Sequence, residues 1–186
     1  MTPSRHPVTP PPATGEVVVL VDRNDRETGT MSKADAHRKG VLHRAVSVLV
    51  RNAAGEMLLQ RRALGKYHSP GLWSNACCTH PRPGESPLDA ARRRLREELG
   101  IKAQPTFLFH FIYRLELDRG AIEHEYDHVF TATCEGPVRP DPAEVMDHRW
   151  VGAGDLAGEM AMEPESFTGW FRIIMGEAEG SAWQGD

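Results

Sequence analysis

The sequence has few cysteines, no long apolar run and no excess of basic residues. Its three cysteines include the adjacent pair Cys77 and Cys78, which makes a poor disulfide framework. No run approaches the roughly 20 apolar residues of a membrane helix, and no apolar signal region follows Arg5. The net charge is −4, with no basic stripe of the kind that binds nucleic acid. We therefore expect a cytoplasmic protein without nucleic-acid or membrane partners.

The middle of the chain has the composition of a folded domain, and both ends differ from it. With 40% hydrophobic and 26% charged residues among 186, the chain is typical of a single globular domain. Residues 1–15 are rich in proline, serine and threonine and are expected to form a disordered lead-in. We predict one domain over residues 16–175 and a loose tail over residues 176–186.

Between these ends, strand-like runs alternate with helical patterns. The expected strands are residues 17–21, 45–50, 57–60, 107–117, 126–133 and 149–151. Residues 52–55 have the composition of a hairpin turn between the second and third of these strands. A helix is expected to start near Pro164, because large apolar residues then recur every three or four positions. The pattern predicts an α/β (α+β) fold with a mixed sheet between helices.

The clearest helix is predicted over Pro87–Leu99. Ser86 is suited to the N-cap, proline to the first helical position, and Gly100 to the C-terminal stop. Leu95 and Leu99 fall on one face at helical spacing, together with apolar residues of the preceding turns. This face is expected to pack on the sheet.

Residues 84–101, which include this helix, resemble the Nudix box. The Glu97–Glu98 pair and the upstream Glu85 match the family pattern, whereas Arg94 replaces a glutamate and Thr79 replaces the opening glycine. Carboxylates on one helix can hold Mg²⁺ while the ion bridges diphosphate oxygens. Replacing a metal-binding carboxylate by a guanidinium favours a diphosphate that is bound rather than hydrolysed.

Six short stretches, in order along the chain, extend the resemblance over residues 16–175. They are residues 40–47 (GVLHRAVS), 60–63 (QRRA), 70–75 (PGLWSN), 78–81 (CTHP), 123–125 (EHE) and 144–147 (EVMD). Together they resemble type I isopentenyl-diphosphate isomerases, a branch of the Nudix fold with a degenerate box. The resemblance implies an enzyme of isoprenoid biosynthesis that interconverts isopentenyl and dimethylallyl diphosphate.

The resemblance places a metal site at three imidazoles and two carboxylates. These residues are His37, His43, His80, Glu123 and Glu125. The two glutamates are two positions apart, so on a strand they face the same side. Imidazole with carboxylate suits Zn, Mn, Fe or Co, and we expect Mn²⁺ or Zn²⁺ here.

The reaction implied is a metal-assisted 1,3-allylic shift by protonation and deprotonation. The resemblance assigns Glu125 and Tyr113 to one side of the substrate and Cys78 to the other. Trp170 would offer its ring to the carbocation. Cys77 receives no role, and Cys134 is expected in the core.

Binding of the diphosphate is assigned by the resemblance to four basic residues. These are Lys33, Arg62, Lys66 and Arg94. A second ion, Mg²⁺, would link the diphosphate to Glu98 and to the Cys78 region. The expected partner is thus a small-molecule diphosphate, and the chain is compatible with a monomer.

Two other functions are open on the residues alone. A Nudix hydrolase of a nucleoside diphosphate derivative would share the fold and the magnesium, but Arg94 and Thr79 break its box. A non-enzymatic protein with a structural metal would use the histidines and carboxylates. It would leave the four basic residues without a purpose.

Overall fold

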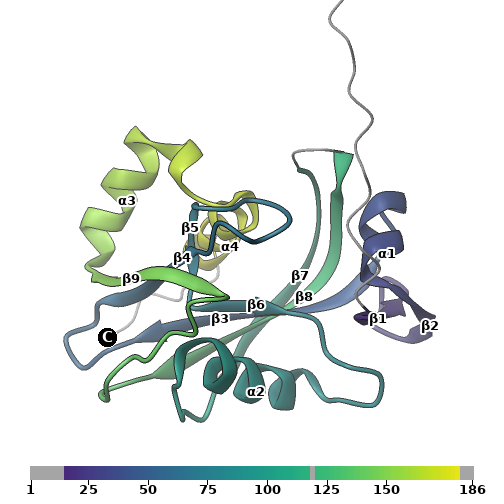
Figure 1. The fold of residues 1–186 in the computed structure, drawn as a ribbon, viewed down its shortest axis with the longest axis horizontal. Helices are drawn as coiled ribbons and strands as arrows, with labels where there is room; N and C mark the ends of the chain where they lie inside the picture. The colour runs from purple at the N-terminus through teal and green to yellow at the C-terminus, as the bar shows by residue number, and fades with distance from the viewer. Residues whose placement is uncertain (1–14, 118–119, 181–186) are drawn as a thin grey trace, which may run out of the picture.

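The computed structural model describes residues 15–117 and 120–180 (Figure 1). Its strands are β1 (Val17–Val21), β2 (Glu27–Ser32), β3 (His43–Arg51), β4 (Met57–Arg62), β5 (Trp73–Asn75), β6 (Cys77–Thr79), β7 (Thr106–Glu116), β8 (Ile122–Thr133) and β9 (Val145–Val151). Its helices are α1 (Lys33–Lys39), α2 (Pro87–Leu99), α3 (Ala153–Met162), the 3₁₀ helix η2 (Pro164–Ser166) and α4 (Gly169–Gly180).

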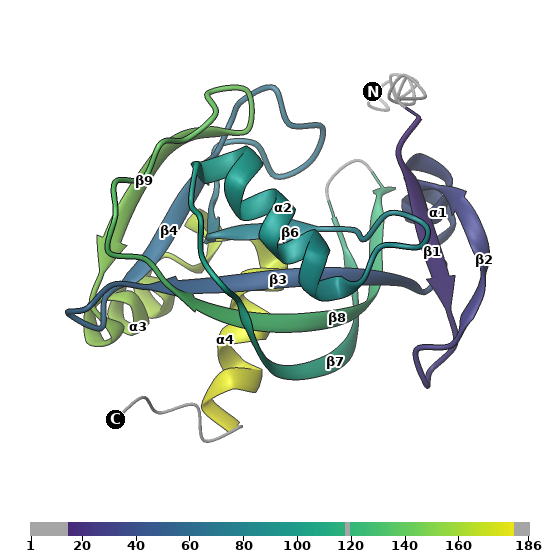
Figure 2. The ribbon, with the colours of Figure 1, turned by 90° about the horizontal axis from the view of Figure 1, so that it is seen from below.

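These strands form one mixed sheet around β3. The order β2-β1-β3-β4-β5 is extended by β6 and β8 on β3, by β7 on β8 and by β9 on β4. The β3–β8 pair is parallel, and the other pairs are antiparallel. Parallel neighbours need a long connection, and the one between β3 and β8 contains α2. In Figure 2, α1 lies with β1 and β2 beyond one end of β3.

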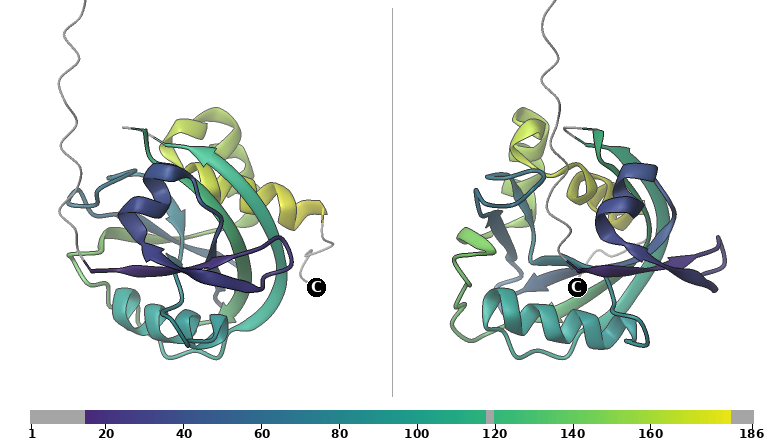
Figure 3. Two further views of the ribbon diagram at one scale, coloured as in Figure 1. Left: turned by 90° about the vertical axis from the view of Figure 1, so that its right-hand side faces the viewer. Right: turned by 45° about the vertical axis from the view of Figure 1, so that its right-hand side comes forward.

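Alternate residues of the central strands pack against helices on opposite faces of the sheet. On β3, Val48 belongs to the cluster that includes α2, whereas Leu49 belongs to the cluster that includes α3 and α4. On β4, Leu58 and Leu59 divide in the same way. This alternation follows from the two-residue period of a strand. Figure 3 shows α2 on one side of the sheet and α4 on the other, so the predicted sandwich is confirmed.

Helix α2 has the bounds that the sequence predicts. The Ser86 hydroxyl accepts a hydrogen bond from the Asp89 N–H at 3.1 Å, and Gly100 ends the helix in the left-handed region with φ 67°. Leu95 and Leu99 are fully buried, and burying a leucine contributes about 1.5–3 kcal/mol. Burial of these two leucines fixes the orientation of α2, and with it the orientation of its polar side.

The C-terminal segment differs from the prediction in two ways. Pro164 begins only a 3₁₀ turn, because Phe167 is extended and the Thr168 N–H bonds to the Trp73 carbonyl at 2.8 Å. Helix α4 then continues to Gly180, beyond the expected start of the tail at residue 176, because Ala178 is buried one turn after Ile174. The rest of the expected tail (181–186) and residues 1–14 of the lead-in lie outside the described residues.

The predicted strands are all present, and two of them begin four residues earlier than expected. β8 begins at Ile122 rather than at residue 126, and β9 begins at Val145 rather than at residue 149. Polar residues at the start of β8, including Glu123 and Glu125, hide the strand pattern there. The short or polar elements β2, β5, β6, α1 and α3 were not anticipated. None of the described helices has the length and apolar character needed to cross a membrane.

Candidate active site and metal centre

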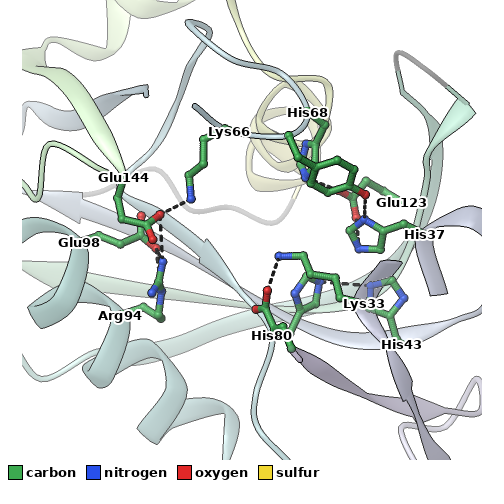
Figure 4. Close-up of polar contacts among 12 residues, drawn as sticks. Lys33, His37, His43, Lys66, His68, His80, Arg94, Glu98, Glu123 and Glu144 are labelled. Carbon is green, nitrogen blue, oxygen red and sulfur yellow. Dashed lines mark hydrogen bonds and ion pairs between the residues drawn. The ribbon is translucent and has the colours of Figure 1, made fainter. Parts of the chain in front are cut away.

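Five buried side chains meet at one point with their ligand atoms within 4.8 Å of one another. They come from α1, the start of β3, the residue after β6, and β8: His37, His43, His80, Glu123 and Glu125. Figure 4 shows the three imidazoles and Glu123 close together. The structure therefore brings together the five residues that the sequence predicted as a metal site. Cys78 and Glu98, also predicted as metal residues, lie outside this cluster.

Strand register explains how residues far apart in sequence meet here. His43 is opposite Glu125 in the parallel β3–β8 pair, and Thr79, just before His80, is opposite Val46 in the β3–β6 pair. Helix α1 is held near β8 because His124 Nδ1 donates to the Gly40 carbonyl at 2.9 Å. A shift of one residue in β8 would turn both glutamates to the opposite face.

Three buried atoms of the cluster residues have no hydrogen-bond partner among the described residues. They are His37 Nε2, His80 Nδ1 and Glu123 Oε2, and the first and last of these lie 3.5 Å apart. An unsatisfied buried polar group costs about 1–3 kcal/mol, and more when it is charged. A divalent cation between His37 Nε2 and Glu123 Oε2 would satisfy these two atoms, so the residues present fit a metal ion.

The protonation states also suit a metal. Burial lowers the pKa of His37 to about 2 and the pKa of His80 to about 4, so both imidazoles are neutral near neutral pH. Neutral imidazole is the form that coordinates metals. Burial, together with the charge of Glu125, raises the pKa of Glu123 well above its ordinary value. A cation would supply the opposite charge that favours the ionised carboxylate.

Glu125 connects this cluster to Tyr113. Its Oε1 lies 2.9 Å from His80 Nε2 and 3.6 Å from His43 Nε2, and its Oε2 accepts a hydrogen bond from the Tyr113 hydroxyl at 2.7 Å. Burial opposes its ionisation, but the neighbouring His43 and His80 hold the pKa of Glu125 well below its ordinary value. Burial raises the pKa of Tyr113 well above its ordinary value, so this group keeps its proton.

Cys78 lies in a second hydrogen-bonded group that the sequence did not predict. Its thiol donates to Asn75 Oδ1 at 3.1 Å and lies 3.4 Å from Ser47 Oγ. The Ser47 hydroxyl donates to Asp127 Oδ2 at 2.8 Å. Burial, with the nearby Asp127, raises the pKa of Cys78 to about 12, so the group is a thiol at neutral pH. Cys77 and Cys134 are buried among apolar residues.

A cavity of about 700 Å³ joins these groups. Its walls include Cys78, His80, Tyr113, Glu123, Glu125 and Trp170. Trp170 donates its indole N–H to Ser74 Oγ at 3.1 Å, and the Arg62 guanidinium lies 5.1 Å from its ring centre. The cavity thus combines a thiol, a carboxylate–tyrosine pair and an aromatic surface.

The four predicted basic residues line the same cavity. They are Lys33, Arg62, Lys66 and Arg94. Lys33 pairs with Glu16 at 3.1 Å, and both Lys66 and Arg94 pair with Glu144. Arg62 donates to the carbonyls of His68 and Ser69 at 3.1 and 3.2 Å. Figure 4 shows Lys66 and Arg94 on the side of the site away from the histidines, and we call the part of the cavity around these two residues the cationic region.

Glu98 lies beside this cationic region and is only 3% exposed. Its Oε1 is 2.7 Å from Arg94 Nη2, and its Oε2 accepts from Gln60 Nε2 at 3.1 Å. Both carboxylate oxygens thus have protein partners. Burial raises the pKa of Glu98, although Arg94 opposes this effect.

Several residues at the site were not predicted by the sequence reasoning. Tyr67 and His68 contact the metal cluster from the segment between β4 and β5, and Ser47, Asn75 and Asp127 surround Cys78. Ser47 interrupts the apolar run of β3, and Asp127 lies between Tyr126 and His128 in the polar half of β8. A polar residue at a buried strand position is the signal that would have found them.

Comparisons with known proteins identify the family of this chain. Residues 41–171 match the NUDIX domain. The chain is 49% identical over 156 residues to the isopentenyl-diphosphate Delta-isomerase of Pectobacterium atrosepticum, covering 84% of this chain and 87% of that protein. It is 52% identical over 151 residues to the enzyme of the same name from Cereibacter sphaeroides strain KD131, covering 79% and 84%.

Solved structures show the same fold at low sequence identity. The crystal structure of DR0079 from Deinococcus radiodurans has a TM-score of 0.67 at 21% identity, covering 79% of this chain and 90% of that one. The MutT protein from Methanosarcina mazei Go1 has a TM-score of 0.61 at 24% identity, covering 74% and 93%. The NUDIX match and the far closer relatives together establish that this chain belongs to the isopentenyl-diphosphate Delta-isomerase family.

Proposed function

We propose that this chain interconverts isopentenyl diphosphate and dimethylallyl diphosphate for isoprenoid biosynthesis. The observation that carries the proposal is one cavity that contains the Cys78 thiol, the Glu125–Tyr113 pair and the four basic residues. A 1,3 proton shift needs one proton donor and one proton acceptor at the hydrocarbon end. It also needs fixed positive charge at the diphosphate end. The relatives' shared name supports the same reaction.

The resting protonation states supply the donor and the acceptor. Cys78 is a thiol because its pKa is raised, and Glu125 is a carboxylate because its pKa is lowered. In one direction, the thiol proton adds to the terminal alkene carbon and leaves a tertiary cation. The carboxylate then removes a proton from the carbon on the other side of the cation, and the double bond forms there. In the reverse direction the two groups exchange roles.

Trp170 and the buried part of the cavity would protect the cation. An aromatic face attracts a cation by up to about 2 kcal/mol when water is excluded. Arg62 already lies 5.1 Å from the Trp170 ring centre, so the carbocation would share this ring with a guanidinium. The burial of Trp170 and Tyr113 limits access of water, which would convert the cation to an alcohol.

Two metal ions belong to the proposal. Mn²⁺ or Zn²⁺ would be held by the five-residue His/Glu cluster and would favour the ionised form of Glu125. Mg²⁺ would accompany the diphosphate near Lys66 and Arg94. Binding of that ion by Glu98 would compete with the contacts of this carboxylate to Arg94 and Gln60.

The hydrolase alternative shares the fold but leaves part of the site unused. In the proposal, Arg94 neutralises Glu98 and binds the diphosphate, whereas hydrolysis of the Nudix type would use a carboxylate at residue 94. A structural metal protein would need neither the thiol nor the cationic region. Both alternatives predict no proton exchange with the substrate carbon chain.

The test is isomerisation in deuterated water. Purified protein is incubated with isopentenyl diphosphate and Mg²⁺, with Mn²⁺ or Zn²⁺ present, and followed by NMR. Dimethylallyl diphosphate with deuterium in a methyl group is the expected product. Undeuterated, unchanged substrate under these conditions would refute the proposal, and release of phosphate from a nucleoside diphosphate derivative would establish the hydrolase instead.

A further inference from the structure

His37 is held in place by a residue outside the five-residue cluster. Its Nδ1 lies 2.9 Å from the Tyr67 hydroxyl oxygen. Its other ring nitrogen, Nε2, is buried without a hydrogen-bond partner and faces Glu123 Oε2 at 3.5 Å. The contact between the Tyr67 hydroxyl and Nδ1 can therefore determine which nitrogen of His37 carries the hydrogen.

The tautomer follows from the partner of each nitrogen. A neutral imidazole has one N–H and one lone pair, and a metal takes the lone pair. Nε2 points toward Glu123 and the other ligands, so Nδ1 must carry the hydrogen and needs an acceptor. The hydroxyl oxygen of Tyr67 is that acceptor. Partners of this kind orient metal-binding histidines and fix their tautomers.

His43 shows the same arrangement with a backbone partner. Its Nδ1 lies 2.8 Å from the Val41 carbonyl oxygen, which can only accept a hydrogen bond. The hydrogen of His43 is therefore on Nδ1, and its Nε2 points toward His80 Nε2 at 3.2 Å. In His37 the equivalent partner is a side chain, so a single substitution can remove it.

The location of Tyr67 explains how the contact is maintained. Tyr67 lies between Lys66 and His68. Lys66 pairs with Glu144 in the cationic region. The His68 ring lies edge-on to the Trp170 ring, with 5.6 Å between their centroids. The Tyr67 and His68 rings are themselves packed edge to face at 4.7 Å. The segment is thus fixed on both sides of Tyr67.

We infer that Tyr67 is a positioning residue for the metal site, whose hydroxyl accepts the Nδ1 hydrogen of His37 and keeps Nε2 directed at the ion. The inference rests on the proposed function, because it assumes a metal in the five-residue cluster. Loss of a partner of this kind typically weakens metal affinity by about 10–100-fold.

The test compares Tyr67→Phe with the matched control Tyr126→Phe. Tyr126 is 7% exposed and, one position after Glu125 on β8, faces the opposite side of the sheet. Zn²⁺ affinity is measured by competition with a chelating dye, and the histidine tautomers are read from ¹⁵N NMR of the full chain. We expect Tyr67→Phe to weaken Zn²⁺ binding by about 10–100-fold and to mix the His37 tautomers in the metal-free protein. Tyr126→Phe should change neither.

The outcomes separate this inference from the proposed metal site. Wild-type affinity and an unchanged Nδ1–H tautomer of His37 in Tyr67→Phe would overturn the inference while leaving the metal site intact. Failure of the wild-type protein to bind Zn²⁺ or Mn²⁺ would overturn the metal site itself. Weakened binding by His37→Ala, measured in parallel, would establish that His37 is a ligand and that the Tyr67 result bears on it.

Discussion

Arg94 and Glu98 lie one helical turn apart on α2, with Arg94 Nη2 2.7 Å from Glu98 Oε1. The guanidinium also lies 3.3 Å from Glu144 Oε2, so it connects two carboxylates at the edge of the cavity. A carboxylate at residue 94 would instead gather three acidic groups there. In our proposal, this departure from the Nudix box lets the helix face bind an anion rather than a cation.

Arg94→Gln should therefore weaken binding of the diphosphate more than it slows the chemical step. Hydrogen bonds to charged groups contribute about 1.5–3 kcal/mol, which corresponds to a rise in KM of about 10–150-fold. Steady-state kinetics with isopentenyl diphosphate measures this change. Arg96 is an exposed arginine on the same helix. The control is therefore Arg96→Gln, which should leave KM unchanged. An unchanged KM in Arg94→Gln would remove Arg94 from the binding site.

Cys78→Ala should abolish most turnover, because it deletes one of the two groups that exchange a proton with the substrate. General acid–base catalysis accelerates a reaction by about 10²–10⁴-fold. We therefore expect kcat to fall by a factor in this range or larger, while the Kd for the diphosphate changes little. The adjacent Cys77→Ala is the control, since Cys77 is fully buried in the apolar cluster beside α2. Equal losses of kcat in the two variants would contradict the assignment to Cys78.

Removal of the metal should destabilise the protein as well as inactivate it. His37 Nε2 and Glu123 Oε2 lose their only expected partner when the ion leaves. A ligand at 100 times its Kd contributes about 2.7 kcal/mol to stability, so chelation should lower Tm measurably. Restoring Zn²⁺ or Mn²⁺ should recover Tm in the wild type but not in His80→Ala. A Tm insensitive to chelator would argue against a metal in this cluster.

Stability should depend on pH through His68. Burial lowers the pKa of His68 to about 2, so the folded protein keeps it neutral, whereas the unfolded chain protonates it below a pH of about 6.5. The unfolded state then binds more protons, and the His68 contribution to stability falls as pH falls, by up to about 1.4 kcal/mol per pH unit.

His68→Leu removes this penalty. Its free energy of unfolding relative to the wild type should therefore rise as the pH falls from about 6.5 toward about 4. Urea denaturation in the presence of a chelator measures the difference. A difference that stays constant with pH would show that His68 titrates alike in the folded and unfolded states.

Much of the fold and of the candidate site was predictable from local sequence. Helix α2 has the predicted bounds because Ser86, Pro87 and Gly100 mark its ends by backbone chemistry that operates within a few residues. The same-side orientation of Glu123 and Glu125 follows from strand period alone. Four of the five metal-cluster residues lie in the short stretches that carry the family resemblance, whereas His37 lies just before the first of them.

Only the tertiary structure decided which groups surround these residues. Tyr67 reaches His37 from 30 positions away, and Asp127 reaches Ser47 from 80 positions away. No local pattern encodes such contacts, because the register of β3 with β8 and the path of the segment between β4 and β5 create them. The sequence by itself determined the types of chemical group and the ends of the main helix. The packing of the sheet decided which of those groups are buried and which form hydrogen bonds with one another. Burial and hydrogen bonding in turn set their protonation states.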